Sequence, residues 1–258
     1  MLNIQNIAIA GTGNLAWHLA KNLKNKGFHV LGVWSRNQLH AREFADLFSI
    51  RAVTHIAELK DQADLIVIAV SDSAVDEVAL QLGKFDGLVV HTAGSLDLRV
   101  LSAFFENCGV FYPLQTFSKN VELDLSVVPF FLECSSSEGL RLLHSFTEQI
   151  SAYVFEADSA TRLKIHTAGV FASNYSNLMF GIANELLKDQ HFKSEILHPL
   201  ITETARKALE TDPFSVQTGP ARRNDMLTIK KHLDSLADHP QYAEIYKLLA
   251  DFIIHQYH

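Results

Sequence analysis

The chain has 258 residues, of which 48% are apolar and 20% are charged, a composition typical of folded globular proteins. Its formal net charge of −7 argues against nucleic-acid binding, which requires a basic face. No segment approaches the roughly 20 consecutive apolar residues of a membrane span, and no basic segment precedes the apolar N-terminus as in a secretory signal. We therefore expect a soluble, cytoplasmic protein that binds neither nucleic acid nor membrane.

The cysteines and histidines do not indicate a metal site. Cys108 and Cys134 are not spaced as a CxxC pair, and in a cytoplasmic protein we expect both to be reduced thiols. None of the 13 histidines has the HExxH spacing or a comparable ligand spacing. We predict no bound metal.

Short apolar and β-branched runs alternate with segments of helical periodicity through the first 155 residues. The runs are residues 4–10, 28–34, 65–70, 88–90, 110–112 and 127–132. Because they are apolar at consecutive positions, we expect strands buried on both faces, in a mostly parallel sheet between helices. The predicted fold class is α/β, with a Rossmann-type doubly wound sheet.

The pattern changes after Asp158, and no strand pattern follows Phe155. Residues 160–187 contain no proline and predict one long helix, with Asp158 or Ser159 as its N-cap. Further helices are predicted over residues 195–210, 225–237 and 241–254, although Pro199 lies awkwardly near a helix start. We therefore divide the chain into a cofactor-binding domain, residues 1–156, and an all-α substrate and dimerisation domain, residues 157–258.

The first predicted strand leads directly into a dinucleotide fingerprint, G-x-G-x-x-A, at residues 11–16. Gly11 permits the tight turn, Gly13 leaves room for a pyrophosphate, and the following helix directs its positive N-terminus at that group. The cofactor residues predicted in this turn are Gly11, Thr12, Gly13, Asn14 and Leu15. The alternative is an ordinary glycine-rich turn, which the strand before it and the amphipathic helix after it make less favourable.

The end of the second predicted strand favours NADP over NAD. NAD sites usually carry Asp or Glu there to bind the ribose 2′-hydroxyl, whereas this chain has Ser35 and Arg36. Arg36 suits a 2′-phosphate and Ser35 can donate to it. Ser35 alternatively caps the helix that starts near Asn37, and both roles are compatible.

Two further strand ends are expected at the same crevice. Ser71 follows the third strand, and His91, Ala93 and Gly94 lie in the loop after the fourth, so both loops are placed to line the cofactor. A helix N-cap is the alternative for Ser71 and Asp72. A simple turn is the alternative for Ala93 and Gly94.

Four segments occur in the order expected of one family: the fingerprint, the loop 91–95, residues 111–118 (FYPLQTFS) and residues 218–222 (TGPAR). On these segments the whole chain resembles bacterial Rossmann-like NADP oxidoreductases with a C-terminal domain of unknown function. That family is related to pyrroline-5-carboxylate reductase, ketopantoate reductase, the deazaflavin-dependent NADP reductases and the 6-phosphogluconate dehydrogenase superfamily. One departure is Asn224, where the family pattern leads us to expect glycine before Asp225.

The resemblance implies a Rossmann domain followed by a 6-phosphogluconate dehydrogenase-like helical domain, with the active site between them and a homodimer formed through the C-terminal helices. In related reductases a helix at the position of residues 160–187 places polar side chains beside the nicotinamide. His166 is the candidate proton donor, because histidine titrates near neutrality, and Asn174 or Asn177 is the candidate to hold the substrate. A 3.6-residue period places a polar stripe on this helix, made of Arg162, His166, Ser173, Asn177 and Asn184. The alternative is that this polar stripe forms hydrogen bonds across a dimer interface.

Four other residues are candidates for substrate binding. Tyr112, Gln115 and Thr116 occupy a strand-end loop, although Pro113 makes a structural role equally acceptable. Arg222 can bind a substrate carboxylate, or form a surface ion pair instead.

The leading hypothesis is an NADP(H)-dependent reductase of a small carbonyl or imine compound that carries a carboxylate. The alternatives are an NADP(H)-binding protein without turnover and a deazaflavin-linked NADP reductase.

Overall fold

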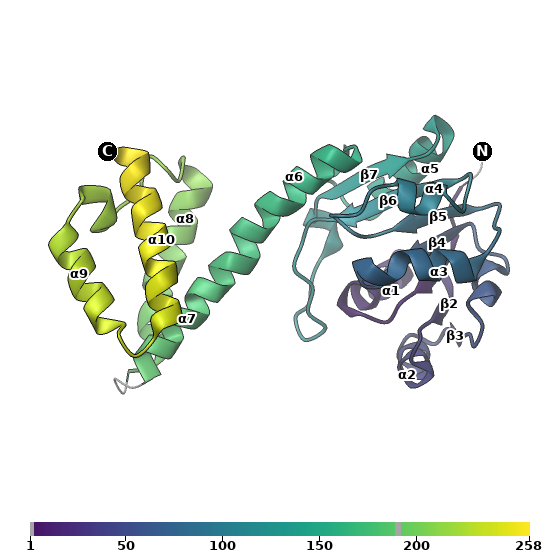
Figure 1. The fold of residues 1–258 in the computed structure, drawn as a ribbon. Helices are drawn as coiled ribbons and strands as arrows, with labels where there is room; N and C mark the ends of the chain where they lie inside the picture. Colours follow the sequence, from purple (N-terminus) through teal and green to yellow (C-terminus); the bar gives the residue numbers. More distant parts are fainter. Residues whose placement is uncertain (1–2, 189–191) are drawn as a thin grey trace. The chain divides into compact units, whose positions relative to one another are not determined.

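The computed structural model describes residues 3–188 and 192–258 of the chain. It contains two compact units, Met1–Asn174 and Tyr175–His258, which are described separately here (Figure 1). The first unit contains all of the described strands, and the second is helical. The boundary falls within the long helix that begins at Ser159, so residues 159–174 are grouped with the sheet.

Within the described residues the sheet has eight strands in the order β3-β2-β1-β4-β5-β6-β7-β8. Neighbouring strands are parallel except for β6 and β7, which are antiparallel. The strands are β1 Asn6–Ala10, β2 His29–Trp34, β3 Arg51–Ala52, β4 Leu65–Ile68, β5 Leu88–His91, β6 Cys108–Pro113, β7 Phe130–Cys134 and β8 Val154–Glu156. This is the predicted Rossmann-type sheet, and its order reverses between β1 and β4, where dinucleotide cofactors bind in this fold.

Alternate residues along the strands divide the core into two layers. Ile7 and Ile9 pack with the apolar faces of α1, α2 and α5, whereas Ala8 and Ala10 pack with α3, α4 and the short 3-10 helix Ile56–Lys60. The helices are α1 Asn14–Asn25, α2 Gln38–Phe48, α3 Val75–Leu82, α4 Arg99–Ser102 and α5 Ser137–Glu148. Helices therefore cover both faces of the sheet, as the continuous apolar runs predict.

Two short strands were not predicted from the sequence. Strand β3 has only two residues, too few to produce a period, and β8 is a three-residue strand at the sheet edge. The run predicted at residues 127–132 begins as a strand only at Phe130, because Leu125–Val127 form a 3-10 turn. The other predicted strands lie within about two residues of their predicted bounds, which is the usual uncertainty of such assignments.

The long helix predicted over residues 160–187 consists of α6 Ser159–Gly169, a π-helical segment Val170–Tyr175 and α7 Ser176–Lys188. Its N-cap is Asp158, whose carboxylate accepts a hydrogen bond from the Thr161 amide at 2.8 Å. The 3.6-residue period used to predict a polar stripe along this helix does not hold across the π-helical segment, because π turns contain more residues than α turns.

In the second unit, α9 Met226–Ser235 and α10 Pro240–Tyr257 pack around a small core of Ala221, Ile229 and Ala250. Helix α8 His198–Glu210 has Pro199 in its first turn, where proline is tolerated. Asn224 has φ of 54°, in the left-handed region that favours glycine, and asparagine is the residue that best replaces glycine there. The departure from the family pattern at this position therefore preserves the turn before Asp225, which caps α9 by accepting from the Thr228 amide at 3.0 Å.

Both cysteines are free, and burial raises the pKa of Cys134 to about 12, so this thiol stays protonated. The described residues contain no helix of the length and apolar character needed to cross a membrane. They also contain no cluster of three or more His, Cys, Asp or Glu side chains suited to a metal ion.

Candidate cofactor and active site

The glycine-rich turn between β1 and α1 has the geometry that the fingerprint requires. Gly11 has φ of 127°, and a Cβ added to it would lie 2.1 Å from the carbonyl oxygen of Ala69, so only glycine fits there. Gly13 is the N-cap of α1, and no described atom lies within 4 Å of the position that its Cβ would occupy. The open space above Gly13 and the uncapped start of α1 suit a pyrophosphate.

A cavity of about 440 Å3 opens at this turn. Its lining includes the predicted residues Gly11, Thr12, Gly13, Asn14, Leu15, Ser35, Arg36 and Ser71, together with Trp34, Ala69, Val70, Ala74, Val78 and Thr92. The loops after β1, β2, β4 and β5 therefore meet at one edge of the sheet. His91, Ala93 and Gly94 do not line this cavity, although their neighbour Thr92 does.

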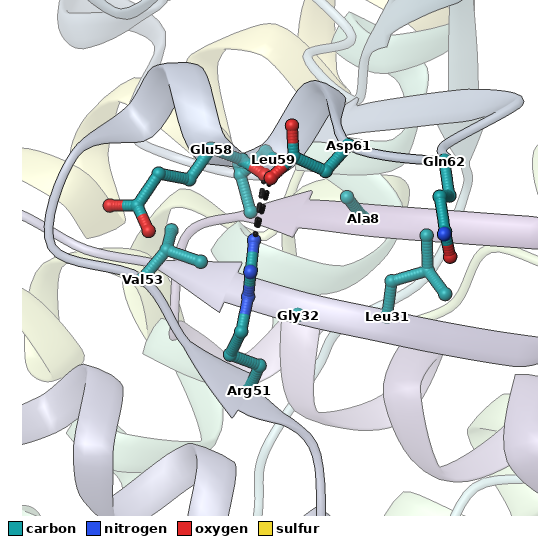
Figure 2. A pocket seen from close by; sticks show the side chains of 9 residues that line it. All are labelled: Ala8, Leu31, Gly32, Arg51, Val53, Glu58, Leu59, Asp61 and Gln62. Carbon is teal, nitrogen blue, oxygen red and sulfur yellow. Dashed lines mark hydrogen bonds and ion pairs between the residues drawn. The ribbon is translucent and has the colours of Figure 1, made fainter.

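A larger hollow of about 630 Å3 lies over the middle of β1 and β2, away from the carboxyl ends of the strands (Figure 2). There the Arg51 guanidinium donates to the Glu58 carbonyl at 2.9 Å and pairs with Asp61 at 3.4 Å. Because Arg51 is already bound within the chain and the fingerprint is elsewhere, the smaller cavity is the candidate cofactor site, and we call it the cofactor cavity.

Hydrogen bonds distinguish between the roles predicted for Ser35. Asn37 caps α2, since its side-chain oxygen accepts from the amides of Leu39 and His40 at 3.0 and 3.4 Å. The proposed capping role of Ser35 is therefore wrong. Its hydroxyl instead lies 3.4 Å from the Thr12 hydroxyl, at the rim of the cofactor cavity.

Ser71 occupies the N-cap position of the 3-10 turn Asp72–Ala74 that leads into α3, as one alternative predicts, whereas Asp72 does not cap the helix. Helix α3 starts after Ala74, and no side-chain hydrogen bond caps it or the 3-10 turn Asp72–Ala74 in the described structure. The Asp72 carboxylate instead accepts a short hydrogen bond from the Ser95 hydroxyl. This bond joins the loop after β4 to the loop after β5.

His91 is completely buried at the end of β5. Its Nδ1 accepts a hydrogen bond from the Ala93 amide at 3.2 Å, which shapes the loop leading to Gly94. Burial, assisted by the nearby Arg162 charge, lowers the pKa of His91 to about 4, so the imidazole is neutral at physiological pH. His91 therefore stabilises the conformation of the loop after β5.

Tyr112, His166 and Gly94 meet at the carboxyl ends of β5 and β6. The Tyr112 hydroxyl lies 3.0 Å from His166 Nδ1, with the two rings edge to face. A Cβ on Gly94 would lie 2.7 Å from both His166 Nδ1 and Tyr112 Cζ. The two rings can therefore approach each other there only because Gly94 has no side chain. Burial raises the pKa of Tyr112, which keeps its hydroxyl protonated, so this group can either donate to or accept from His166 Nδ1.

A buried arginine holds the first turn of α6 against the sheet. Arg162 is fully buried and forms an ion pair with Glu133 of β7 and a hydrogen bond to the Leu96 carbonyl. The Ser159 hydroxyl donates to the same Glu133 carboxylate at 2.8 Å. The sequence places Arg162 in the polar stripe with His166 but does not reveal this role. Its partners are 29 and 66 residues away in the chain.

The remaining predicted residues do not join this cluster within the described unit. Gln115 and Thr116 are exposed, and the Gln115 side chain accepts from the Thr116 amide at 2.8 Å. Asn174 is exposed in the π-helical segment. Asn177 and Arg222 belong to the second unit, where the Arg222 guanidinium lies 4.1 Å from the centre of the Tyr257 ring.

These features define a Rossmann-type, dinucleotide-binding oxidoreductase fold. The chain is 40% identical to the "putative NADP oxidoreductase" of Bacteroides fragilis, with 98% of each chain covered and a TM-score of 0.92. Residues 6–93 match the family described as NADP oxidoreductase, coenzyme F420-dependent, and residues 128–253 match a domain of unknown function, DUF2520. The chain therefore belongs to this family of NADP oxidoreductases with a DUF2520 C-terminal domain, as its motifs predict.

More distant structures share the fold. A pyrroline-5-carboxylate reductase of Streptococcus pyogenes is 15% identical, with 96% of this chain and 98% of that chain covered and a TM-score of 0.63. A reductive aminase of Aspergillus terreus, solved with NADPH and ethyl-5-oxohexanoate, is 14% identical, with 97% and 93% covered and a TM-score of 0.71. No curated protein sequence matches the chain.

Proposed function

We propose that this protein is an NADP(H)-dependent reductase of a small carbonyl or imine compound that carries a carboxylate. The observation that carries the proposal is the hydrogen-bonded pair of Tyr112 and His166, packed against Gly94 at the strand ends beside the cofactor cavity. A proton donor at that place is what a reductase needs and what a protein that only binds the cofactor does not need.

The order of the strands supports this placement. Along the sheet edge, Ser35 and Arg36 follow β2, the glycine-rich turn follows β1, Ser71 follows β4 and Gly94 follows β5. A dinucleotide whose pyrophosphate lies on the glycine-rich turn and whose adenosine lies towards β2 extends its nicotinamide towards β4 and β5. Tyr112, near the end of β6, is the next strand-end residue in that direction.

The cofactor assignment to NADP rests on Ser35 and Arg36, which offer a hydroxyl and a guanidinium where an NAD site presents a carboxylate. When bound, the nicotinamide supplies hydride to the substrate carbon. The reductive aminase of similar fold was solved with NADPH and a keto ester, which agrees with this class of substrate.

His166 is suited to supply the proton that accompanies hydride transfer. In the protonated ring both nitrogens donate, so Nδ1–H can donate to the Tyr112 hydroxyl oxygen and Nε2–H can pass its proton to a substrate oxygen or nitrogen that gains negative charge, which leaves a neutral imidazole. We assign substrate binding to Gln115, Thr116, Asn174, Asn177 and Arg222 on the basis of their chemistry, with the Arg222 guanidinium as the group suited to a carboxylate.

A second candidate function is hydride exchange with a deazaflavin, because the family that matches residues 6–93 is described as coenzyme F420-dependent. That match ends before Tyr112 and His166, the residues on which the reductase proposal depends. We also place the protein in the cytoplasm, because free thiols are typical of a reducing compartment.

The test is NADPH oxidation, followed by loss of NADPH absorbance, against a panel of keto acids, imino acids and oxidised F420. With an active keto or imino acid, His166→Asn should lower kcat while the Kd for NADPH stays unchanged, because His166 does not line the cofactor cavity. A matched control is His144→Asn, on the outer helix α5. Turnover with F420 alone would favour the second candidate, and NADPH binding without turnover on the whole panel would favour a binding protein.

A further inference from the structure

Residues 114–124, the first part of the segment between β6 and β7, lie along one face of α1, and we call them the strap. Asn14, His18 and Asn22 are spaced four residues apart on α1, so they share that face. Each of these side chains bonds a backbone carbonyl of the strap. The three bonds join Asn14 Nδ2 to Phe117 O at 2.9 Å, His18 Nε2 to Ser118 O at 2.9 Å, and Asn22 Nδ2 to Leu123 O at 3.5 Å.

Further contacts fix the strap on either side of Lys119. His18 is 1% exposed, and its ring lies 5.6 Å from the Phe117 ring, measured between centroids. Beyond Lys119, Glu122 forms an ion pair with Lys21 of α1 at 2.7 Å. The backbone that carries Lys119 is thus held in place on both sides, although the Lys119 side chain itself is exposed.

The Lys119 side chain is directed to the cofactor turn. Its Nζ donates to the Thr12 carbonyl at 3.0 Å, and the Thr12 hydroxyl is 3.4 Å from the Ser35 hydroxyl. Lys119 and Thr12 also line a cavity of about 290 Å3 with His40 and Glu43 of α2. Since Thr12 lines this cavity and the cofactor cavity alike, the Lys119 amine is beside the end of the site that binds the adenosine.

The charge balance of the site indicates a use for this amine. Among the described residues that line the cofactor cavity, Arg36 is the only charged one. NADP carries a pyrophosphate and a 2′-phosphate, and a phosphate monoester alone has a charge of about −1.5 to −2 at neutral pH. The chain as a whole has a net charge of −7, so its long-range field opposes such a ligand.

We propose that Lys119 is the second cation for the 2′-phosphate of NADP(H), contributed by the strap and acting with Arg36 and Ser35. This inference rests on the proposed function, because it assumes that the cavity binds NADP(H). A phosphate oxygen is a stronger acceptor for an ammonium group than the neutral Thr12 carbonyl, so the amine exchanges one for the other when the phosphate arrives. Lys119 thereby determines cofactor specificity from a position 83 residues beyond Arg36.

The test is calorimetric titration of wild type, Lys119→Gln and Lys119→Arg with NADPH and, separately, with NADH. Lys119→Gln should raise the Kd for NADPH roughly three- to tenfold. This change lies between the loss of an exposed ion pair and the loss of a charge-assisted hydrogen bond. Its NADH affinity should be unchanged, and Lys119→Arg should keep most of the NADPH affinity. Lys84→Gln, which removes the same charge from an exposed position after α3, is the matched control.

Equal weakening of NADPH and NADH in Lys119→Gln would show that Lys119 supports the turn or the pyrophosphate, and would overturn the proposal. Unchanged affinity for both would overturn it as well. Arg36→Gln separates this inference from the proposed function. If wild type prefers NADPH and Arg36→Gln removes the preference, the NADP assignment holds whatever Lys119 does. If wild type binds neither cofactor, the proposed function fails, and this inference fails with it.

Discussion

Replacing Gly94 with alanine tests the geometry of the candidate active site by its effect on stability, for which no substrate is required, as well as by turnover. Gly94 does not have a left-handed φ, so alanine suits its backbone conformation. The added Cβ would meet His166 Nδ1 and Tyr112 Cζ at 2.7 Å, whereas ordinary van der Waals contacts start near 3.4 Å. Each ring must therefore retreat by about 0.7 Å, and the 3.0 Å hydrogen bond between them would lengthen beyond a useful distance.

We expect Gly94→Ala to lower the free energy of unfolding by about 1–3 kcal/mol, the usual cost of overpacking. Turnover on an active substrate should fall by about 100-fold, since a displacement near 1 Å at reacting groups has that effect. Gly181→Ala is the control, because no described atom lies within 4 Å of the position of its Cβ, in the middle of α7. Alanine should stabilise that helix by up to about 1 kcal/mol.

A double-mutant cycle in denaturant identifies the cause of the stability change. His166→Ala removes one of the two rings that the new Cβ meets, so Gly94→Ala should cost about half as much in that background. An equal cost in both backgrounds would refute the reasoning, because the clash would then not involve His166.

The glycine-rich turn, the buried His91 and the helical unit each lead to a further prediction. Gly13→Ala should leave the unfolding free energy nearly unchanged, because no atom of the described residues lies within 4 Å of the position of the new Cβ. The same change should abolish NADPH binding measured by calorimetry, and retained affinity would contradict the assigned pyrophosphate position. His91 should make the protein less stable in acid. The pKa of His91 is about 4 in the folded protein and 6.5 in the unfolded chain. About 3 kcal/mol of the free energy of unfolding is therefore present above pH 6.5 and is lost as the pH falls towards 4. Denaturant titrations of His91→Gln at several pH values should lack this dependence. The helical unit should form a homodimer, because it exposes large apolar side chains. The exposed fractions of Leu178, Leu248 and Phe252 are 49%, 71% and 60%. Light scattering that shows a monomer at micromolar concentration would exclude the homodimer.

The parts of the fold that the sequence predicts are those that depend on local chemistry or on repeated patterns. The fingerprint at Gly11 and Gly13, the N-cap Asp158 and the buried strands all follow from neighbouring residues. The cap of α2 is not predicted correctly, because the sequence analysis assigns it to Ser35, whereas the first helical turn begins two residues later and is capped by Asn37.

The candidate site is predicted less completely, because its decisive contacts are distant in the chain. The sequence identifies Tyr112 and His166 as separate candidates, and their hydrogen bond crosses 54 residues. The Asp72 bond to Ser95 replaces a local cap that the sequence favours, which only the folded position of the two loops can reveal. Lys119 carries no motif of its own, and its contact with Thr12 spans 107 residues.

The strap also affects the order in which the protein can fold. Asn14 and His18 belong to the first helix of the chain, but the carbonyls that they bond are about 100 residues further on. Contacts of such high sequence separation form late and slowly, because the intervening chain must first be closed into a loop. A nascent or truncated chain that ends before Phe117 would contain the entire nucleotide fingerprint but leave His18 without the carbonyl that it bonds and without the ring that covers it. We therefore expect cofactor competence to arise only after β6 and β7 have paired, as a property of the complete Rossmann unit and not of its first βαβ segment.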